Sequence, residues 1–162
     1  MTGVPLSQSE LFHLIARAQA AYTRCVDDER AQSWPDFFTE SCLYVVTTAD
    51  NYAAGFEAGL MYADSRGMLE DRISALNEAN IYEQQSYRHL LGQPDIRNVS
   101  DDGIDVETSF MVVRIMRNGG TSVFASGRYI DRYVVEQGRA LLAKRIVVCD
   151  SKTIDTLLAL PL

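Results

Sequence analysis

The side chains of this sequence that could do chemistry are two histidines and a few Tyr, Arg and Asp residues. His89 follows Arg88 in the stretch YRHLLGQPDI, and Tyr82 and Tyr87 come just before it. The remaining candidates on predicted strands are Arg128, Tyr129, Asp131, Arg145 and Asp150. Side chains of these types can transfer protons without a metal ion. A metal-free acid–base site is therefore one hypothesis for His89, and a structural or subunit contact is the other.

Metal and nucleotide chemistry find little support in the sequence. A zinc or iron site needs three or more His, Cys or carboxylate ligands, and an iron–sulfur cluster needs four Cys or His ligands. His13 is expected on a helix surface, and Cys25, Cys42 and Cys149 are far apart in the chain. No C-x-x-C, H-x-H, G-x-G-x-x-G, G-x-x-x-x-G-K-[ST] or G-x-S-x-G motif occurs. We expect no metal or cofactor in this chain.

Composition limits the class of protein and its partners. The 162 residues suit a single domain, 1–162, and 22 acidic against 15 basic residues give a net charge of −7. This charge would repel nucleic acid and anionic membranes. No apolar run approaches the ~20 residues that span a bilayer, and the first residues do not resemble a signal peptide. The odd number of cysteines favours a reducing cytoplasm over a disulfide framework.

The first half of the chain has helical patterns. Ser7 and Glu10 form a capping box ahead of apolar residues that recur at helical spacing as far as Val26. We predict a short second helix at 30–34, a strand at 42–48, and another helix from Met68 with Ser65 as its cap. The pattern at 49–64 is ambiguous.

The second half of the chain has strand patterns. We predict long strands at 81–99, 104–117, 121–136 and 140–150, with turns at RNGG and EQGRA that make successive hairpins. Strands longer than the usual five or six residues should curl, with the helices on the concave side. The sequence therefore predicts an α+β cone: a curved antiparallel sheet packed around the N-terminal helices.

Strand alternation separates several of the candidate residues. Tyr82 and Arg88 should share one face of their strand, and Tyr87 and His89 the other. Arg128 and Asp131 should also lie on opposite faces. Arg88 and His89 therefore should not line one pocket together, which favours a structural or subunit contact for His89.

Two apolar segments predict further contacts. In FMVVRIM, Phe110 and Val112 should face one side of the sheet, and Met111, Val113 and Ile115 the other. An apolar second face suggests a partner subunit. The tail IDTLLALPL either joins that contact or folds back onto the core.

Several segments together carry a resemblance to a known family. They are WPDFFTESCLYVVTTADN, YADSRGMLEDRISALNEANIYE, YRHLLGQPDI, SFMVVRIM, VFASGRYID and KRIVVCDS…DTLLALPL. In this order and spacing, the chain resembles the small (β) subunit of aromatic-ring-hydroxylating oxygenases of the Rieske non-haem iron class. The resemblance runs from about Ala20 to Leu162 and is greatest to small subunits of enzymes that act on aromatic acids.

The resemblance implies a cystatin-like, NTF2-like cone and a non-catalytic role. In this family the large (α) subunit holds the Rieske [2Fe–2S] cluster, the mononuclear iron and the substrate pocket, commonly in an α3β3 assembly. The β subunit is expected to self-associate as a trimer. The complex would dihydroxylate a terephthalate- or benzoate-like aromatic carboxylate, and no catalytic residue is carried over to this chain.

Two alternatives share the same fold. The first is a stand-alone, metal-free isomerase, dehydratase or hydrolase, with His89, Tyr82 or Asp131 as the acid–base group. It predicts an enclosed pocket into which two or more polar side chains converge, whereas a filled interior would count against it. The second is a binding protein with a pocket but no chemistry.

Overall fold

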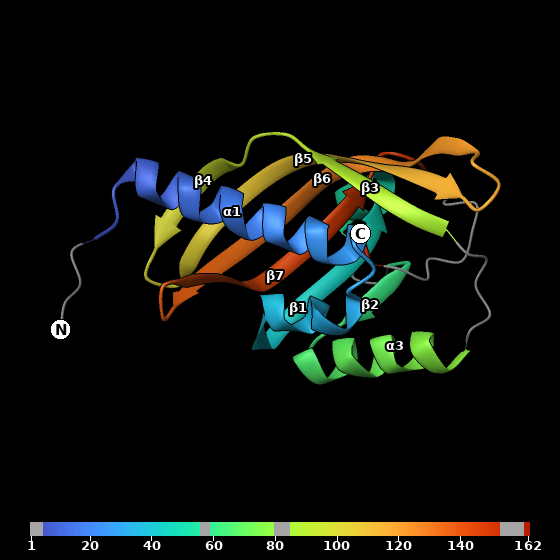
Figure 1. Ribbon diagram of the computed structural model, residues 1–162. Coiled ribbons are helices and arrows are strands. Elements are labelled where there is room, and N and C mark those ends of the chain that lie inside the picture. The colour runs from blue at the N-terminus through green and yellow to red at the C-terminus, as the bar shows by residue number, and fades with distance from the viewer. Residues whose placement is uncertain (1–4, 56–58, 80–84, 153–160) are drawn as a thin grey trace.

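One curved, seven-stranded sheet carries the long N-terminal helix on its concave side (Figure 1). The computed structural model describes residues 5–55, 59–79, 85–152 and 161–162. The helical elements are α1 (Gln8–Asp27), the 3-10 helix η1 (Ala31–Phe37), α2 (Ala49–Ala53) and α3 (Arg66–Ala79). The strands are β1 (Phe38–Thr48), β2 (Met61–Ala63), β3 (Gln85–Leu91), β4 (Asp95–Ser100), β5 (Gly103–Met116), β6 (Thr121–Glu136) and β7 (Arg139–Cys149). This arrangement confirms the predicted α+β cone.

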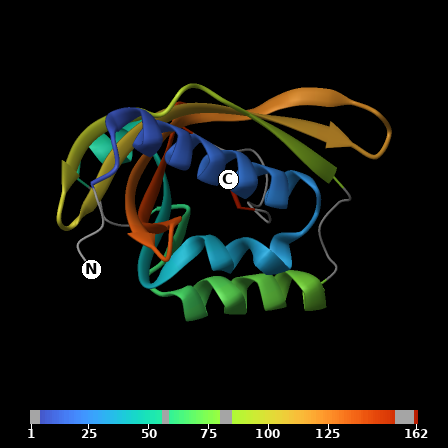
Figure 2. The same cartoon turned by 60° about the vertical axis from the view of Figure 1, so that its left-hand side comes forward.

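Helix α1 crosses the concave face of the sheet, and its start is set by the predicted capping box (Figure 2). The Ser7 hydroxyl accepts a hydrogen bond from the Glu10 backbone N–H at 3.3 Å, and the Ser7 N–H donates to the Glu10 carboxylate at 2.8 Å. These two bonds satisfy donors that the first helical turn leaves free. The buried face of α1 includes Ile15, Tyr22 and Val26.

The short elements differ from the sequence prediction mainly in their ends. The predicted helix at 30–34 is η1, which continues through Pro35. The predicted strand at 42–48 is the second half of β1, which begins at Phe38. The ambiguous segment holds α2 and β2. Ser65 caps α3 as predicted, because its hydroxyl accepts from the Met68 N–H at 3.3 Å.

The prediction of a purely antiparallel sheet is wrong at one pairing. The strand order is β2-β1-β7-β6-β5-β3, with β4 also paired to β5, and β1 runs parallel to β7. All the other pairs are antiparallel. Strands β1 and β7 are far apart in the chain, so no hairpin turn imposes an antiparallel direction on them.

The prediction of one strand over 81–99 is also wrong. Within that range the structure has β3 and β4, and both pair with β5. The break falls at 92–94, where Pro94 has no backbone N–H to donate to the ladder. The predicted residues 81–84, including Tyr82, lie outside the described residues.

The two predicted turns join β5 to β6 and β6 to β7. In the second turn, Gln137 and Gly138 both have positive φ, at 50° and 76°, which is typical of a two-residue hairpin. Strands β6 and β7 approach each other closely at Gly127, where an added Cβ would lie only 1.9 Å from the Val148 carbonyl oxygen. A side chain at that position would push β6 and β7 apart.

The predicted second apolar face of the sheet is present on its convex side. Phe110 and Val112 are buried on the concave side, whereas Met111 and Val113 are only partly buried. Leu90 pairs with Met111, and Val123 pairs with Val113. Leu90 and Val123 are 49% and 62% exposed. We call Leu90, Met111, Val113 and Val123 the outer apolar patch.

Among the described residues, no helix is long and apolar enough to cross a membrane.

Candidate functional site

The concave face of the sheet carries a buried ion pair between Asp131 and Arg145. These residues are register partners on β6 and β7, and neither side chain is exposed to solvent (0% each). The guanidinium donates to the two carboxylate oxygens at 2.9 and 2.8 Å and to the Tyr133 hydroxyl at 3.2 Å. This two-point geometry is the strongest arrangement that an arginine and a carboxylate can form.

Aromatic rings enclose the guanidinium. The Cζ atom of Arg145 lies 3.9 Å from the centre of the Tyr129 ring and 4.3 Å from that of Tyr22. Phe110 stacks on Tyr129 at a centroid distance of 4.5 Å. Such contacts stabilise a cation that has left water. The sequence prediction named Tyr129, Asp131 and Arg145 as candidates, and the structure brings these three together.

The protonation states of the residues in this buried cluster are those of a structural site rather than a reactive one. Burial is the largest single effect and would lower the pKa of the Arg145 guanidinium, but Asp131 together with Tyr133 and Tyr22 outweighs it and raises that pKa well above its usual value. For the Tyr129 and Tyr133 hydroxyls, which are neutral when protonated, burial raises the pKa. Arg145 therefore stays charged and both tyrosines stay protonated at neutral pH, so none of them is suited to proton transfer.

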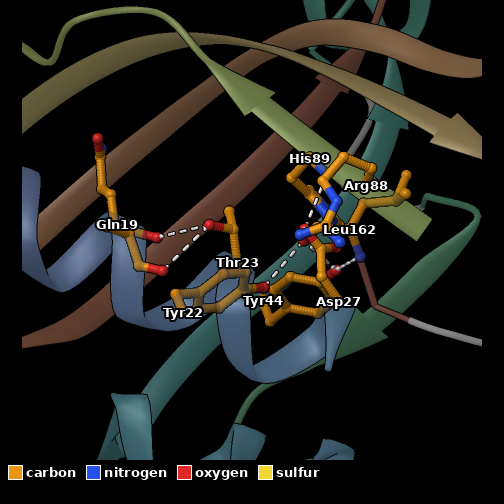
Figure 3. A network of polar contacts seen from close by, with 9 residues as sticks. Gln19, Tyr22, Thr23, Asp27, Tyr44, Arg88, His89 and Leu162 are labelled. Carbon is orange, nitrogen blue, oxygen red and sulfur yellow. Dashed lines mark hydrogen bonds and ion pairs between the residues drawn. The ribbon is translucent and has the colours of Figure 1, made fainter. Parts of the chain in front are cut away.

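Leu162 lies inside the cone between α1 and β1 and is fully buried (Figure 3). The hydroxyls of Tyr22 and Tyr44 donate to its carbonyl oxygen at 2.9 and 3.2 Å. Its backbone N–H donates to the Tyr44 hydroxyl at 3.1 Å. The sequence left open whether the tail joins a subunit contact or folds back onto the core, and for Leu162 the second alternative is confirmed. Residues 154–160 of the tail lie outside the described residues. Here the interior is filled by the chain itself.

His89 is also on the concave side, where it is bound by Asp27 at the end of α1 (Figure 3). Its Nδ1 lies 2.6 Å from one Asp27 carboxylate oxygen, and its backbone N–H donates to the other at 2.9 Å. The two side chains are 0% and 3% exposed. This pair joins the C-terminal end of α1 to the edge strand β3.

Arg88 and His89 lie on opposite faces of β3, as strand alternation predicted, but both contact Asp27. Arg88 does point away from His89, since its side chain is 65% exposed. Its Nη1 nevertheless lies 3.9 Å from the same Asp27 carboxylate. Strand β3 is at the edge of the sheet, so a group beside that edge can reach residues of both faces.

Asp27 is the residue that the sequence analysis missed, because it falls in the acidic run that ends the helix. A signal for it was present. Gln19, Thr23 and Asp27 are spaced four residues apart and therefore lie on one face of α1. Gln19 and Thr23 are both buried, and the Gln19 amide donates to the Thr108 hydroxyl on β5 at 2.8 Å. A polar stripe on the buried face of a helix indicates polar partners in the interior.

The other candidates are not part of either cluster. Arg128 lies on the convex side, opposite to Asp131 as predicted, and pairs with Glu107 at 3.1 Å. Asp150 lies just beyond β7 and accepts from the Ser126 hydroxyl at 3.0 Å. His13 is exposed on α1, as predicted.

The described residues do not fit a metal ion or an iron–sulfur cluster. Among them, no group of three or more His, Cys, Asp or Glu side chains is arranged to hold a metal. Cys25, Cys42 and Cys149 are buried free thiols. Burial raises the pKa of Cys149 to about 11, so this thiol is not a ready nucleophile at neutral pH.

Replacing His89 with alanine should lower the stability of the protein. The change leaves the Asp27 carboxylate with one hydrogen-bond donor fewer in a buried place, which costs about 1–3 kcal/mol of unfolding free energy. Urea unfolding measures the loss. The matched control is His13→Ala, whose exposed ring bonds only within α1, at Ser9, and should change stability by less than about 0.5 kcal/mol. A His89→Ala protein that assembled normally but lost turnover would contradict this structural interpretation.

Comparison with known proteins places the chain among oxygenase subunits. Residues 22–156 match the model of the family described as "Ring hydroxylating beta subunit". The chain is 52% identical to a terephthalate 1,2-dioxygenase terminal oxygenase subunit beta from Comamonas sp., covering 91% of this chain and 96% of that protein. It is 35% identical to the anthranilate 1,2-dioxygenase small subunit of Burkholderia cepacia, covering 89% of each chain.

Solved structures show the same fold. One from Novosphingobium aromaticivorans, assigned as the beta subunit of an aromatic-ring-hydroxylating dioxygenase, is 37% identical with a TM-score of 0.86, covering 94% of this chain and 97% of that chain. The beta subunit of benzoate 1,2-dioxygenase from Burkholderia mallei is 15% identical with a TM-score of 0.72, covering 91% of this chain and 93% of that chain.

Proposed function

Because the chain belongs to the ring-hydroxylating beta-subunit family, we propose that it is the non-catalytic, structural subunit of a Rieske oxygenase that dihydroxylates an aromatic carboxylate. The names of the relatives support the substrate class, since they include terephthalate, anthranilate and benzoate dioxygenases. The observation that carries the structural role is that Arg145 and Leu162 occupy the interior and are bound there by other residues of the chain. Asp131 pairs with Arg145, and the Tyr22 and Tyr44 hydroxyls bind Leu162.

The proposal assigns the redox groups to the large subunit. The Rieske cluster would accept electrons there and the mononuclear iron would activate oxygen, and the described residues of this chain do not fit either group. In this proposal the complex works in the cytoplasm, as an α3β3 assembly in which the β subunits form a trimer.

The outer apolar patch supports a subunit contact. Its members come from β3, β5 and β6 and are neighbours in the sheet register. Leu90 and Val123 are 49% and 62% exposed. Exposing a cluster of large apolar side chains to water is energetically unfavourable, so such a cluster usually marks an interaction surface. We propose that another subunit of the complex covers this patch.

The rival function is a stand-alone acid–base enzyme, and the Asp27–His89 pair is the observation that favours it. A carboxylate bound to Nδ1 orients an imidazole so that Nε2 can act as a base. The rival function requires an enclosed pocket, but Leu162 and the Arg145 cluster fill the interior at these places. An activity of the purified chain toward small aromatic or cyclic substrates, lost in Asp27→Asn, would establish the rival.

Co-expression with the large-subunit gene tests the proposed function. The two chains should purify as one complex with an interface well above the ~1,600 Å² of a standard protein–protein contact. Iron and the visible absorbance of the cluster should follow the complex, while this chain purified alone should contain neither. Stoichiometric iron in the isolated chain, or failure of the two chains to associate, would contradict the proposal.

Val123→Asp tests the outer apolar patch within the same experiment. Val123 is 62% exposed, so a charge there is compatible with the fold of the isolated chain. In the complex it would bury an unpaired carboxylate, and assembly should fall at least tenfold. The control is Val99→Asp on β4, a similarly exposed valine (55%) that is not part of the patch. Equal assembly of both variants would show that the patch is not an interface.

A further inference from the structure

We propose that the two opposite edges of the sheet bind each other in neighbouring copies of this chain. The proposal rests on the β trimer of the proposed function and goes further, because it names the surfaces that form the contact. The first surface is the outer apolar patch together with Arg88, at the β3 edge of the sheet. The second is a stripe at the β2 edge, Leu60, Tyr62 and Asp64, which we call the β2 stripe.

Arg88 lies in one row with two members of the outer apolar patch. Its register partner on β5 is Val113, and Val113 is paired with Val123 on β6. The Cβ atoms of cross-strand partners are about 5 Å apart, so a surface that covers the two valines also removes water from the guanidinium, which is now 65% exposed. Removing water from a charged group is costly unless a counter-ion replaces it.

The counter-ion for Arg88 has to come from the surface that covers it. Asp27 lies 3.9 Å from Nη1 of Arg88, but both of its carboxylate oxygens are already bound by nitrogen atoms of His89 (Figure 3). Glu107, on the convex side of β5, is paired with Arg128. Because an arginine side chain and a carboxylate form a strong two-point pair, we expect an Asp or Glu on the covering surface.

The β2 stripe has the matching chemistry. Its residues alternate with buried ones along the edge strand, so they point to one side. Leu60 and Tyr62 are 52% and 49% exposed, and Asp64 is exposed as well. The next basic residue, Arg66, is paired with Glu40, and the Asp64 carboxylate has no basic partner in the described part of the chain. The stripe therefore offers apolar area to the patch and a carboxylate to the arginine.

Both surfaces face the convex side, but they lie at opposite ends of the strand order. Tyr44, whose hydroxyl binds Leu162 inside the cone, is the register partner of Ala63. Tyr62 is next to Ala63 and therefore points to the convex side. Strands β2 and β3 are the first and the last in the order β2-β1-β7-β6-β5-β3, and Figure 1 shows them on opposite sides of α1. Each copy can therefore bind one neighbour through each surface.

The chemistry of the two surfaces favours a head-to-tail contact over a face-to-face one. The outer apolar patch has no acidic member, so two patches that met face to face would bring two Arg88 side chains into one contact without a carboxylate. In a head-to-tail contact, Arg88 of one copy meets Asp64 of the next, while Leu60 and Tyr62 cover the patch. Such contacts close into a ring when the rotation between copies fits, as a trimer requires.

Sedimentation equilibrium of the full chain alone, without a large subunit, tests the contact. We expect a trimer. Arg88→Asp and Asp64→Arg should each weaken association by about tenfold or more, because each places like charges in the contact. The double variant Arg88→Asp/Asp64→Arg restores opposite charges and should associate within about threefold of the unchanged chain. Arg88→Gln, which removes the charge without reversing it, should also weaken association.

Two charge reversals outside both surfaces are the matched controls. Arg97→Asp on β4 and Glu70→Arg on α3 change exposed side chains and should leave association within about threefold of the unchanged chain. Urea unfolding of every variant shows that it is folded before its association is compared.

A monomer or a dimer at every concentration would overturn the proposal. So would unchanged association in the folded Arg88 variants, or a double variant that associates no better than the single ones. Failure of the proposed function has a different signature, because it is read from co-purification with the large subunit. If the two chains form a complex while the isolated chain stays monomeric, this contact is wrong and the structural role stands.

Discussion

Asp131→Ala is expected to lower the free energy of unfolding by about 3–5 kcal/mol. The substitution removes the carboxylate that binds Arg145 at 2.9 and 2.8 Å, and the guanidinium is left charged in the interior without a counter-ion. The penalty arises from this uncompensated charge, since both side chains are fully buried. Urea unfolding followed by tryptophan fluorescence is a suitable measurement, because the single Trp34 is fully buried.

A more exposed ion pair between β5 and β6 provides the control for Asp131→Ala. The side chains of Glu107 and Arg128 meet across neighbouring strands at 3.1 Å, but they are 32% and 43% exposed. Glu107→Ala should therefore cost less than about 1 kcal/mol. The double variant Asp131→Leu/Arg145→Met should regain most of the stability, since apolar residues of similar volume can replace a buried pair. If Asp131→Ala were no more harmful than Glu107→Ala, the buried pair would not hold β6 and β7 as described.

Leu162→Ala is expected to cost about 2–5 kcal/mol of unfolding free energy. Leu162 is fully buried inside the cone, and alanine would leave a cavity between α1 and β1 that close-packed neighbours cannot readily refill. The backbone hydrogen bonds with Tyr22 and Tyr44 do not involve the Leu162 side chain and can persist in this variant. Deleting Leu162 should be more damaging, because it also leaves the two buried hydroxyls without these partners.

The control for Leu162→Ala is Leu6→Ala, since Leu6 is 44% exposed ahead of α1. It should change the unfolding free energy by less than about 0.5 kcal/mol. A loss below about 1 kcal/mol for Leu162→Ala would mean that the interior does not rely on this residue as a filler. Only the Arg145 cluster would then oppose a stand-alone enzyme with an enclosed pocket.

Local patterns predicted most of the elements because their causes are local. The Ser7 capping box sets the start of α1 through bonds within three residues. The Gln137–Gly138 turn determines the hairpin of β6 and β7, and alternation along β5 assigned Phe110 and Met111 to opposite faces. One error has a non-local cause, and the other comes from a local signal that was overlooked. The parallel β1–β7 pairing joins distant segments, and the two strands within 81–99 were merged because Pro94 was not treated as a strand breaker.

In the candidate site, too, sequence patterns did not identify the contacts between residues that are distant in the chain. The residue types were recognised: His89, Tyr129, Asp131 and Arg145 were all named as candidates from the sequence. Their partners were not, because alternation states which face a side chain occupies but not what lies opposite. Asp131 meets Arg145 only because the β6–β7 register places them side by side. Asp27 meets His89 only because the end of α1 packs against the edge strand β3.

The sequence by itself determined the family, the α+β class, the helix caps, the hairpin turns and the apolar second face of the sheet. These properties depend on residue order, short-range hydrogen bonding and the two-residue period of a strand. Only the tertiary structure decided that Asp131 binds Arg145, that Leu162 is buried inside the cone, and that Asp27 binds one nitrogen of His89. Each of these contacts joins residues that the curvature of the sheet and the crossing of α1 bring together. The spacing of residues along a chain does not specify that geometry.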